Sequence, residues 1–81
     1  MDYRENMQLW VREAVGELGG RATILEVAKE LWSKRENDLR QAGDAFYLWQ
    51  YDMRWAAQKL REKGSLGLEK VGSKSVWTLK H

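Results

Sequence analysis

Residues 44–64, DAFYLWQYDMRWAAQKLREKG, contain five of the nine aromatic residues of this 81-residue chain. Projected at 3.6 residues per turn, the segment forms a helix with an apolar core face: Phe46, Trp49, Met53, Ala56, Ala57 and Leu60. A second flank carries Leu48, Trp55 and Lys59. The remaining side carries Tyr47, Gln50, Tyr51, Arg54, Gln58 and Arg61. We expect a helix with two apolar flanks to lie between two layers of structure with its polar edge exposed.

The ends of this helix are marked by local signals. It is predicted to start at residue 45 or 46, where Asp44 is suited to cap it, and to end at Lys63 before Gly64. The preceding segment 36–44, ENDLRQAGD, is polar with Leu39 as its one apolar anchor. It is predicted to be a long connection or a short helical turn around Leu39.

Two more helices are predicted before that connection. Residues 3–18 repeat apolar side chains at three- and four-residue spacing and stop at Gly19-Gly20. Residues 21–22 form a short extended piece. Thr23 and Glu26 then have the spacing of a capping box, which starts a helix that runs to about Lys34.

The last part of the chain, residues 65–80, is predicted to be a β-hairpin. Residues 65–71 and 75–79 form its strands, and a glycine-bearing turn at 72–74 joins them. A two-stranded hairpin is marginal by itself, so it must pack on the helices. Trp77 and Leu79, or Val76, are the expected anchors.

The order of these elements predicts a single, mainly helical α+β domain over residues 1–81. Its plan is that of a winged helix-turn-helix, with three helices and a two-stranded β-hairpin as the wing. A short third strand is possible at residues 21–22. Two segments, RWAAQKLREKGSL (54–66) and SKSVWTL (73–79), resemble the amino-terminal DNA-binding domain of Mrr-type restriction proteins. The matching positions are Trp55, Ala56, Leu60, Gly64, Val76 and Trp77.

This resemblance implies a small bacterial-type, restriction-system-like domain that binds DNA through a winged helix. In that family the domain precedes a metal-dependent nuclease domain. The resemblance here ends at the hairpin, so no nuclease activity is carried over.

The composition argues against catalysis. The chain has no Cys, and its one His is His81, the last residue, so histidine-dependent triads and the usual zinc ligand sets are excluded. No phosphate-binding glycine motif occurs. We expect no enzyme activity, no cofactor or metal and no small-molecule substrate. The chain also has no long apolar run and no signal-peptide pattern, so we expect a cytoplasmic location without membrane contact.

The charge distribution favours nucleic acid. The net charge is +2, but residues 1–45 carry seven Lys/Arg against nine Asp/Glu, whereas residues 46–81 carry seven against three. Arg and Gln on helix 46–63 suit base edges in a major groove, and lysines at the hairpin turn suit phosphate. The predicted site for double-stranded DNA is therefore Tyr47, Gln50, Tyr51, Arg54, Gln58, Arg61, Lys70, Ser73 and Lys74.

Other interpretations of these residues remain open. The polar edge is also what an ordinary solvated helix face looks like, and the lysines also suit an exposed strand edge. A second function is protein interaction through Tyr47, Tyr51 and Trp55, and a third is a homodimer built on the first helix. We expect Tyr47 and Tyr51 to be partly buried under the long connection.

Overall fold

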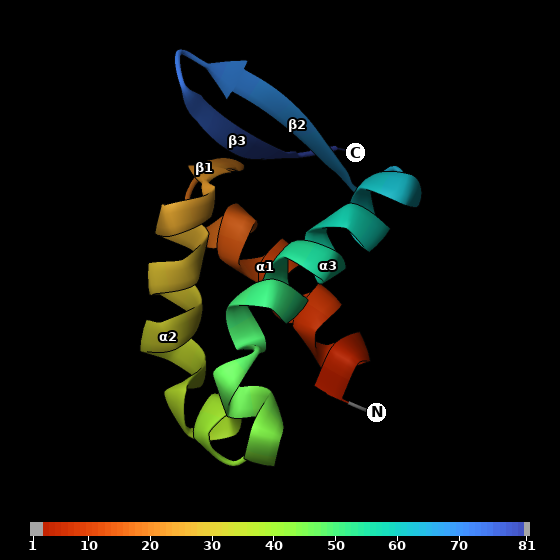
Figure 1. Ribbon diagram of the computed structural model, residues 1–81. Coiled ribbons are helices and arrows are strands. Elements are labelled where there is room, and N and C mark those ends of the chain that lie inside the picture. The colour runs from red at the N-terminus through yellow and green to blue at the C-terminus, as the bar shows by residue number, and fades with distance from the viewer. Residues whose placement is uncertain (1–2, 81) are drawn as a thin grey trace.

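The structure is a computed structural model that describes residues 3–80. Three α-helices, one 3-10 turn and three strands follow each other along the chain (Figure 1). In order, they are α1 (Tyr3–Glu17), β1 (Arg21–Thr23), α2 (Ile24–Arg40), η1 (Gly43–Tyr47), α3 (Trp49–Glu62), β2 (Leu66–Val71) and β3 (Lys74–Leu79).

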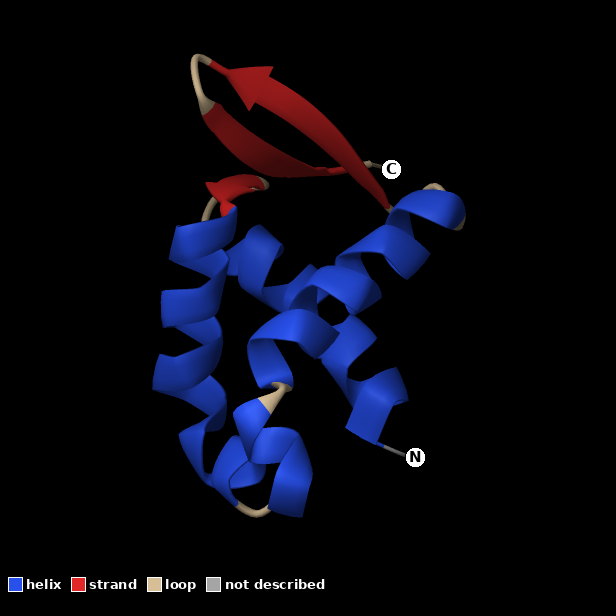
Figure 2. Cartoon of the chain, in the orientation of Figure 1, coloured by secondary structure: helices blue, strands red, loops and turns tan. Residues whose placement is uncertain are grey.

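The sheet caps one end of the helices, as the red strands in Figure 2 show. All pairs are antiparallel and the strand order is β1-β3-β2. The predicted extended piece at 21–22 is thus a real third strand, at the edge of the sheet. The hairpin turns at Gly72-Ser73, where Gly72 takes a φ of +64° that other residues rarely adopt. The α+β class expected from the sequence is confirmed.

The core lies where the three helices and the inner face of the sheet meet. Trp77, only 3% exposed, is paired with Ala22 on one side and Leu68 on the other, so these three share the inner face. Val76 is on the opposite face, where an ion pair of 2.7 Å joins Arg21 and Glu69 across β3. The core comprises Met7, Trp10, Val11, Ala14, Val15, Ala22, Val27, Leu31, Leu39, Trp49, Met53, Ala56, Ala57, Leu60, Leu66 and Trp77.

The capping box at the start of α2 is confirmed. The Thr23 hydroxyl accepts from the Glu26 amide at 3.1 Å, and the Thr23 amide donates to the Glu26 carboxylate at 2.8 Å. These two bonds satisfy donors that a helix start would otherwise leave unpaired.

Replacing Thr23 by Ala should therefore lower the free energy of unfolding by about 1 kcal/mol, the usual effect of losing an N-cap. Chemical denaturation measures this change. Thr23→Ser keeps the hydroxyl and should stay close to wild type. An alanine variant with the wild-type denaturation midpoint would contradict the stabilising role of the cap.

The second helix is continued beyond its predicted end by a kinked extension. α2 runs to Arg40, but the backbone angles at Arg35 (φ −127°, ψ 21°) are non-helical and mark a kink. The regular helix thus breaks directly after Lys34, as predicted, and residues 36–40 form a helical turn, one of the two alternatives expected around Leu39. Leu39 is fully buried in the core, so packing against other elements favours the turn over an open connection.

The predicted start of the third helix was wrong. Residues 43–47 form the separate 3-10 turn η1, and α3 begins at Trp49 with Leu48 as a cap residue that makes no side-chain cap bond. Asp44 lies inside η1 and caps nothing in α3. The Phe46 ring lies 6.1 Å from Trp32 of α2, and the Trp49 ring lies at the same distance from Trp32, so both aromatic residues contact α2 despite the break.

Candidate nucleic-acid interface

One side of α3 carries the polar residues predicted to contact DNA. Its opposite side is buried, with Met53 1% and Leu60 5% exposed. The α-helical period therefore places the polar positions in solvent. We call these exposed residues of α3 the α3 edge: Gln50, Tyr51, Arg54, Gln58 and Arg61.

The two tyrosines are far more exposed than expected. Tyr47, at the end of η1, is 82% exposed and Tyr51 is 68% exposed. The prediction that they are partly buried was wrong, and it is the Phe46 ring that lies against Trp32 of α2. Both rings are available to an outside partner.

The hairpin tip carries the other predicted contacts, and Lys70, Ser73 and Lys74 are all exposed. Lys74 pairs with Val71 and Lys70 with Ser75, which are neighbouring positions along the ladder. Side chains alternate between faces along a strand, so the two lysines project from opposite faces of the hairpin. They flank the turn from both sides instead of forming one patch.

The tip lies over the beginning of α2. Lys74 and Ser75 line one shallow hollow together with Thr23 and Leu25. The hydrogen bonds from Thr23 hold the pKa of the Glu26 carboxyl below its usual range, and the charge of Lys74 adds to this effect. The tip and the first turn of α2 therefore form one continuous surface.

Lys80 is a cation that the sequence analysis did not include in the site. It lines a hollow with Gln58 and Arg61 of the α3 edge. A Cβ built on Gly67 would lie 2.6 Å from the Lys80 Cε atom, so the missing side chain at position 67 makes room for Lys80. A glycine inside a predicted strand was the signal that a close approach occurs there.

The two halves of the chain differ in how many of their basic side chains form ion pairs. Among residues 3–45, four of the seven Lys and Arg residues form ion pairs: Arg21, Lys34, Arg35 and Arg40. Among residues 46–80, Lys59 alone of seven does so. The other six cations of residues 46–80 form no ion pair within the described residues: Arg54, Arg61, Lys63, Lys70, Lys74 and Lys80. Lys63 instead donates a hydrogen bond of 2.8 Å to the Gln8 side chain.

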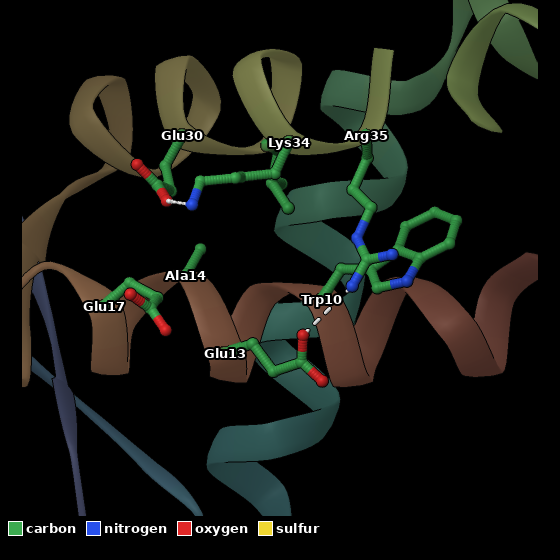
Figure 3. Close-up of a pocket in the computed structure, with 8 residues that line it drawn as sticks. Trp10, Glu13, Ala14, Glu17, Glu30, Lys34 and Arg35 are labelled. Carbon is green, nitrogen blue, oxygen red and sulfur yellow. Dashed lines mark hydrogen bonds and ion pairs between the residues drawn. The ribbon is translucent and has the colours of Figure 1, made fainter. Parts of the chain in front are cut away.

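The groove between α1 and α2 has the opposite character (Figure 3). It has a volume of about 330 Å³, and three glutamates line it. Figure 3 shows that both cations of this groove form ion pairs with glutamates. Arg35 pairs with Glu13 at 3.1 Å, and Lys34 pairs with Glu30 at 3.9 Å. This groove therefore presents no uncompensated positive charge to a phosphate.

An apolar corner lies where α2 meets η1 and the start of α3. Trp32 and Trp49 stack with ring centroids 6.1 Å apart, and Leu25 is 63% exposed beside them. Trp55 does not join this corner or the exposed tyrosines. It is half-buried, with the Arg4 guanidinium 5.0 Å and the Lys59 ammonium 5.9 Å from its ring centroid. The predicted set of Tyr47, Tyr51 and Trp55 is therefore not a uniformly open surface.

Asp52 is a buried carboxylate that the sequence analysis missed. It is 6% exposed in the first turn of α3, where the helix dipole favours negative charge. Burial, with the charge of Asp52 beside it, raises the pKa of Tyr3 well above its usual range. The Tyr3 hydroxyl is buried without a hydrogen-bond partner in the described part of the chain, and its burial with Asp52 brings the starts of α1 and α3 close together.

No protein-family model, curated protein or solved structure matches this chain significantly. Within residues 3–80, His, Cys, Asp and Glu nowhere gather in a group of three or more that could hold a metal ion. None of the helices in that part of the chain is long and apolar enough to cross a membrane.

Proposed function

We propose that this protein is a winged-helix domain that binds double-stranded DNA without catalysing a reaction on it, in the cytoplasm. In this proposal α3 enters a groove and the hairpin is the wing. The element order and the β1-β3-β2 sheet support the winged-helix assignment, and the resemblance of segments 54–66 and 73–79 to Mrr-type DNA-binding domains is consistent with it.

The observation that carries the proposal is the distribution of cations without ion pairs. Arg54 and Arg61 are on the α3 edge, and Lys70, Lys74 and Lys80 are on the hairpin or directly after it. Lys and Arg side chains without carboxylate partners can neutralise phosphates, and this neutralisation is the main source of a protein's affinity for a nucleic-acid backbone. The acid-lined groove between α1 and α2, whose cations are paired with carboxylates, is not part of the contact surface in this proposal.

The side chains between these cations suit base edges. Arg54 and Arg61 lie seven residues apart, about 10 Å along the helix, on the same side of α3 as Gln58. Arg pairs with guanine O6 and N7, and Gln pairs with adenine N6 and N7, in the major groove. The tip lysines, one on each face of the hairpin, would then contact the adjacent backbone.

Amide chemical-shift mapping with a short mixed-sequence duplex tests this proposal. We expect shifts on the α3 edge, at residues 70–74 and at Lys80, and a steep loss of affinity as salt rises. The groove between α1 and α2 should not respond. Absence of any shift at low salt, or binding that ignores salt, would overturn the DNA-binding proposal.

Replacing Lys70 and Lys74 by Gln should weaken binding about equally for all duplex sequences. Each lost phosphate contact removes close to one unit of the log–log salt slope, so the pair should reduce the slope by roughly two. Each single variant should give about half of that reduction. Salt titrations of affinity measure the slope.

The matched control replaces Arg12 of α1 and Lys34 of α2 by Gln, which removes two positive charges that belong neither to the α3 edge nor to the hairpin tip. This control should change the slope far less. An equal effect of both pairs would mean that net charge alone attracts DNA and that the hairpin makes no specific contact.

A protein partner is the second candidate function. It is favoured by the exposure of Tyr47, Tyr51 and Leu25, since aromatic side chains are enriched in protein interfaces. Salt separates the two functions, because an apolar contact is nearly insensitive to it.

A further inference from the structure

The two exposed tyrosines lie between opposite charges. Asp44 precedes Tyr47 by three residues in η1, and Arg54 follows Tyr51 by three residues in α3. Side chains three apart share a face in both kinds of helix. All four side chains are exposed, and neither Asp44 nor Arg54 forms an ion pair within residues 3–80.

The order of these four residues has an internal symmetry. Read forwards it is acid, tyrosine, tyrosine, base, with spacings of three, four and three. Read backwards the spacings are the same and the charges are exchanged. Such a surface is complementary to a copy of itself in the antiparallel direction, which is the requirement for an interface with two-fold symmetry.

We propose that a second copy of this chain docks on this surface, with the two-fold axis between Tyr47 and Tyr51. Tyr47 then packs on Tyr51 of the second copy, and Asp44 pairs with Arg54 of the second copy. Both contacts occur twice. The set Asp44, Tyr47, Tyr51 and Arg54 is called the tyrosine edge below.

Charge complementarity favours a second copy over other occupants. A phosphate backbone would be attracted by Arg54 but repelled by Asp44, and an unrelated protein would not require the symmetric order. Leu48, 57% exposed between the two tyrosines, adds apolar area that a partner would cover. The surface is small, so we expect a weak dimer that dissociates on dilution.

The dimer has a consequence that rests on the proposed DNA function. Arg54 and Tyr51 belong both to the tyrosine edge and to the α3 edge. A second copy and a DNA duplex would therefore compete, and self-association would hold back DNA binding at high protein concentration.

Charge reversal tests the dimer without DNA. Sedimentation equilibrium of the wild type should show an average mass that rises from 9.5 kDa towards twice that value as concentration increases. Asp44→Arg alone, or Arg54→Asp alone, should raise the dimer Kd at least about tenfold, because like charges are brought together. An equimolar mixture of the two variants should restore the dimer, since each contact then joins an acid and a base again.

Reversals of other charges are the controls. Glu17→Arg and Arg12→Asp change exposed residues of α1 that form no ion pair within the described part of the chain, and they should leave the mass curve unchanged. Melting curves confirm that every variant is folded.

Three results would overturn the proposal: a wild type that stays monomeric up to millimolar concentration, a mixture that fails to recover the dimer, or α1 controls that disrupt it. The last result would place the interface on α1. Adding duplex DNA to the wild-type dimer then tests the competition. If the charge exchange works but no duplex binds, the dimer stands and the DNA-binding proposal falls.

Discussion

Replacing Trp77 by Ala should lower the free energy of unfolding by roughly 3–5 kcal/mol, the range for large-to-small changes in a core. Trp77 is 3% exposed and stands between Ala22 and Leu68 on the inner face of the sheet. It is the largest side chain of the central strand in the helical core, against which Leu79 of the same strand also packs, so the loss of Trp77 leaves a cavity beneath the sheet. Chemical denaturation, or the midpoint of thermal unfolding, measures the effect.

Val76→Ala is the matched control for this change. Val76 is the adjacent residue on β3, and it is buried on the outer face, where it does not join the helical core. We expect a clearly smaller loss there. If both variants were equally destabilised, the strand itself and not its contact with the helices would be the stabilising feature.

Replacing Arg54 and Arg61 together by Ala should weaken duplex binding by about 2 kcal/mol or more, or about thirtyfold, because each bidentate contact to a base is worth about 1–3 kcal/mol. Both side chains are exposed and make no ion pair within residues 3–80. The melting temperature should therefore stay nearly unchanged, since such surface changes usually alter stability by less than about 0.5 kcal/mol. Fluorescence anisotropy with a labelled duplex measures the affinity.

The control for this pair is Arg12→Ala with Lys34→Ala, which removes the same charge from α1 and α2. It should lower affinity only slightly. If the Arg54/Arg61 variant binds DNA as tightly as the wild type, α3 is not the recognition helix. If the variant unfolds, these two residues of the α3 edge are needed for the fold.

Local signals in the sequence were sufficient for much of the fold. The Thr23–Glu26 box marked the start of α2, Gly19-Gly20 marked the end of α1, and Gly72-Ser73 marked the hairpin turn. These features depend on hydrogen bonds and backbone angles within a few residues, so the neighbouring sequence is enough to specify them. The exposure of the α3 edge followed equally directly from the helical period.

The region between α2 and α3 could be predicted only in part. Leu39 is one apolar residue in a polar segment, which left a connection and a short helical turn both open, and its burial among other elements decides for the turn. Likewise, Phe46 lies in the separate turn η1, and its contact with Trp32 joins residues fourteen positions apart. Neither contact has a signature in the local pattern of polar and apolar residues.

The sequence by itself determined the helices and hairpin of this protein and which side chains of α3 meet solvent, because periodicity and caps act over short distances. Tertiary structure alone decided where those exposed side chains are placed relative to each other. The kink at Arg35, the separate turn η1 and the register of β3 set the positions of the two tyrosines and of the lysines on opposite faces of the hairpin. These positions depend on the packing of segments distant in the chain, which local composition does not encode.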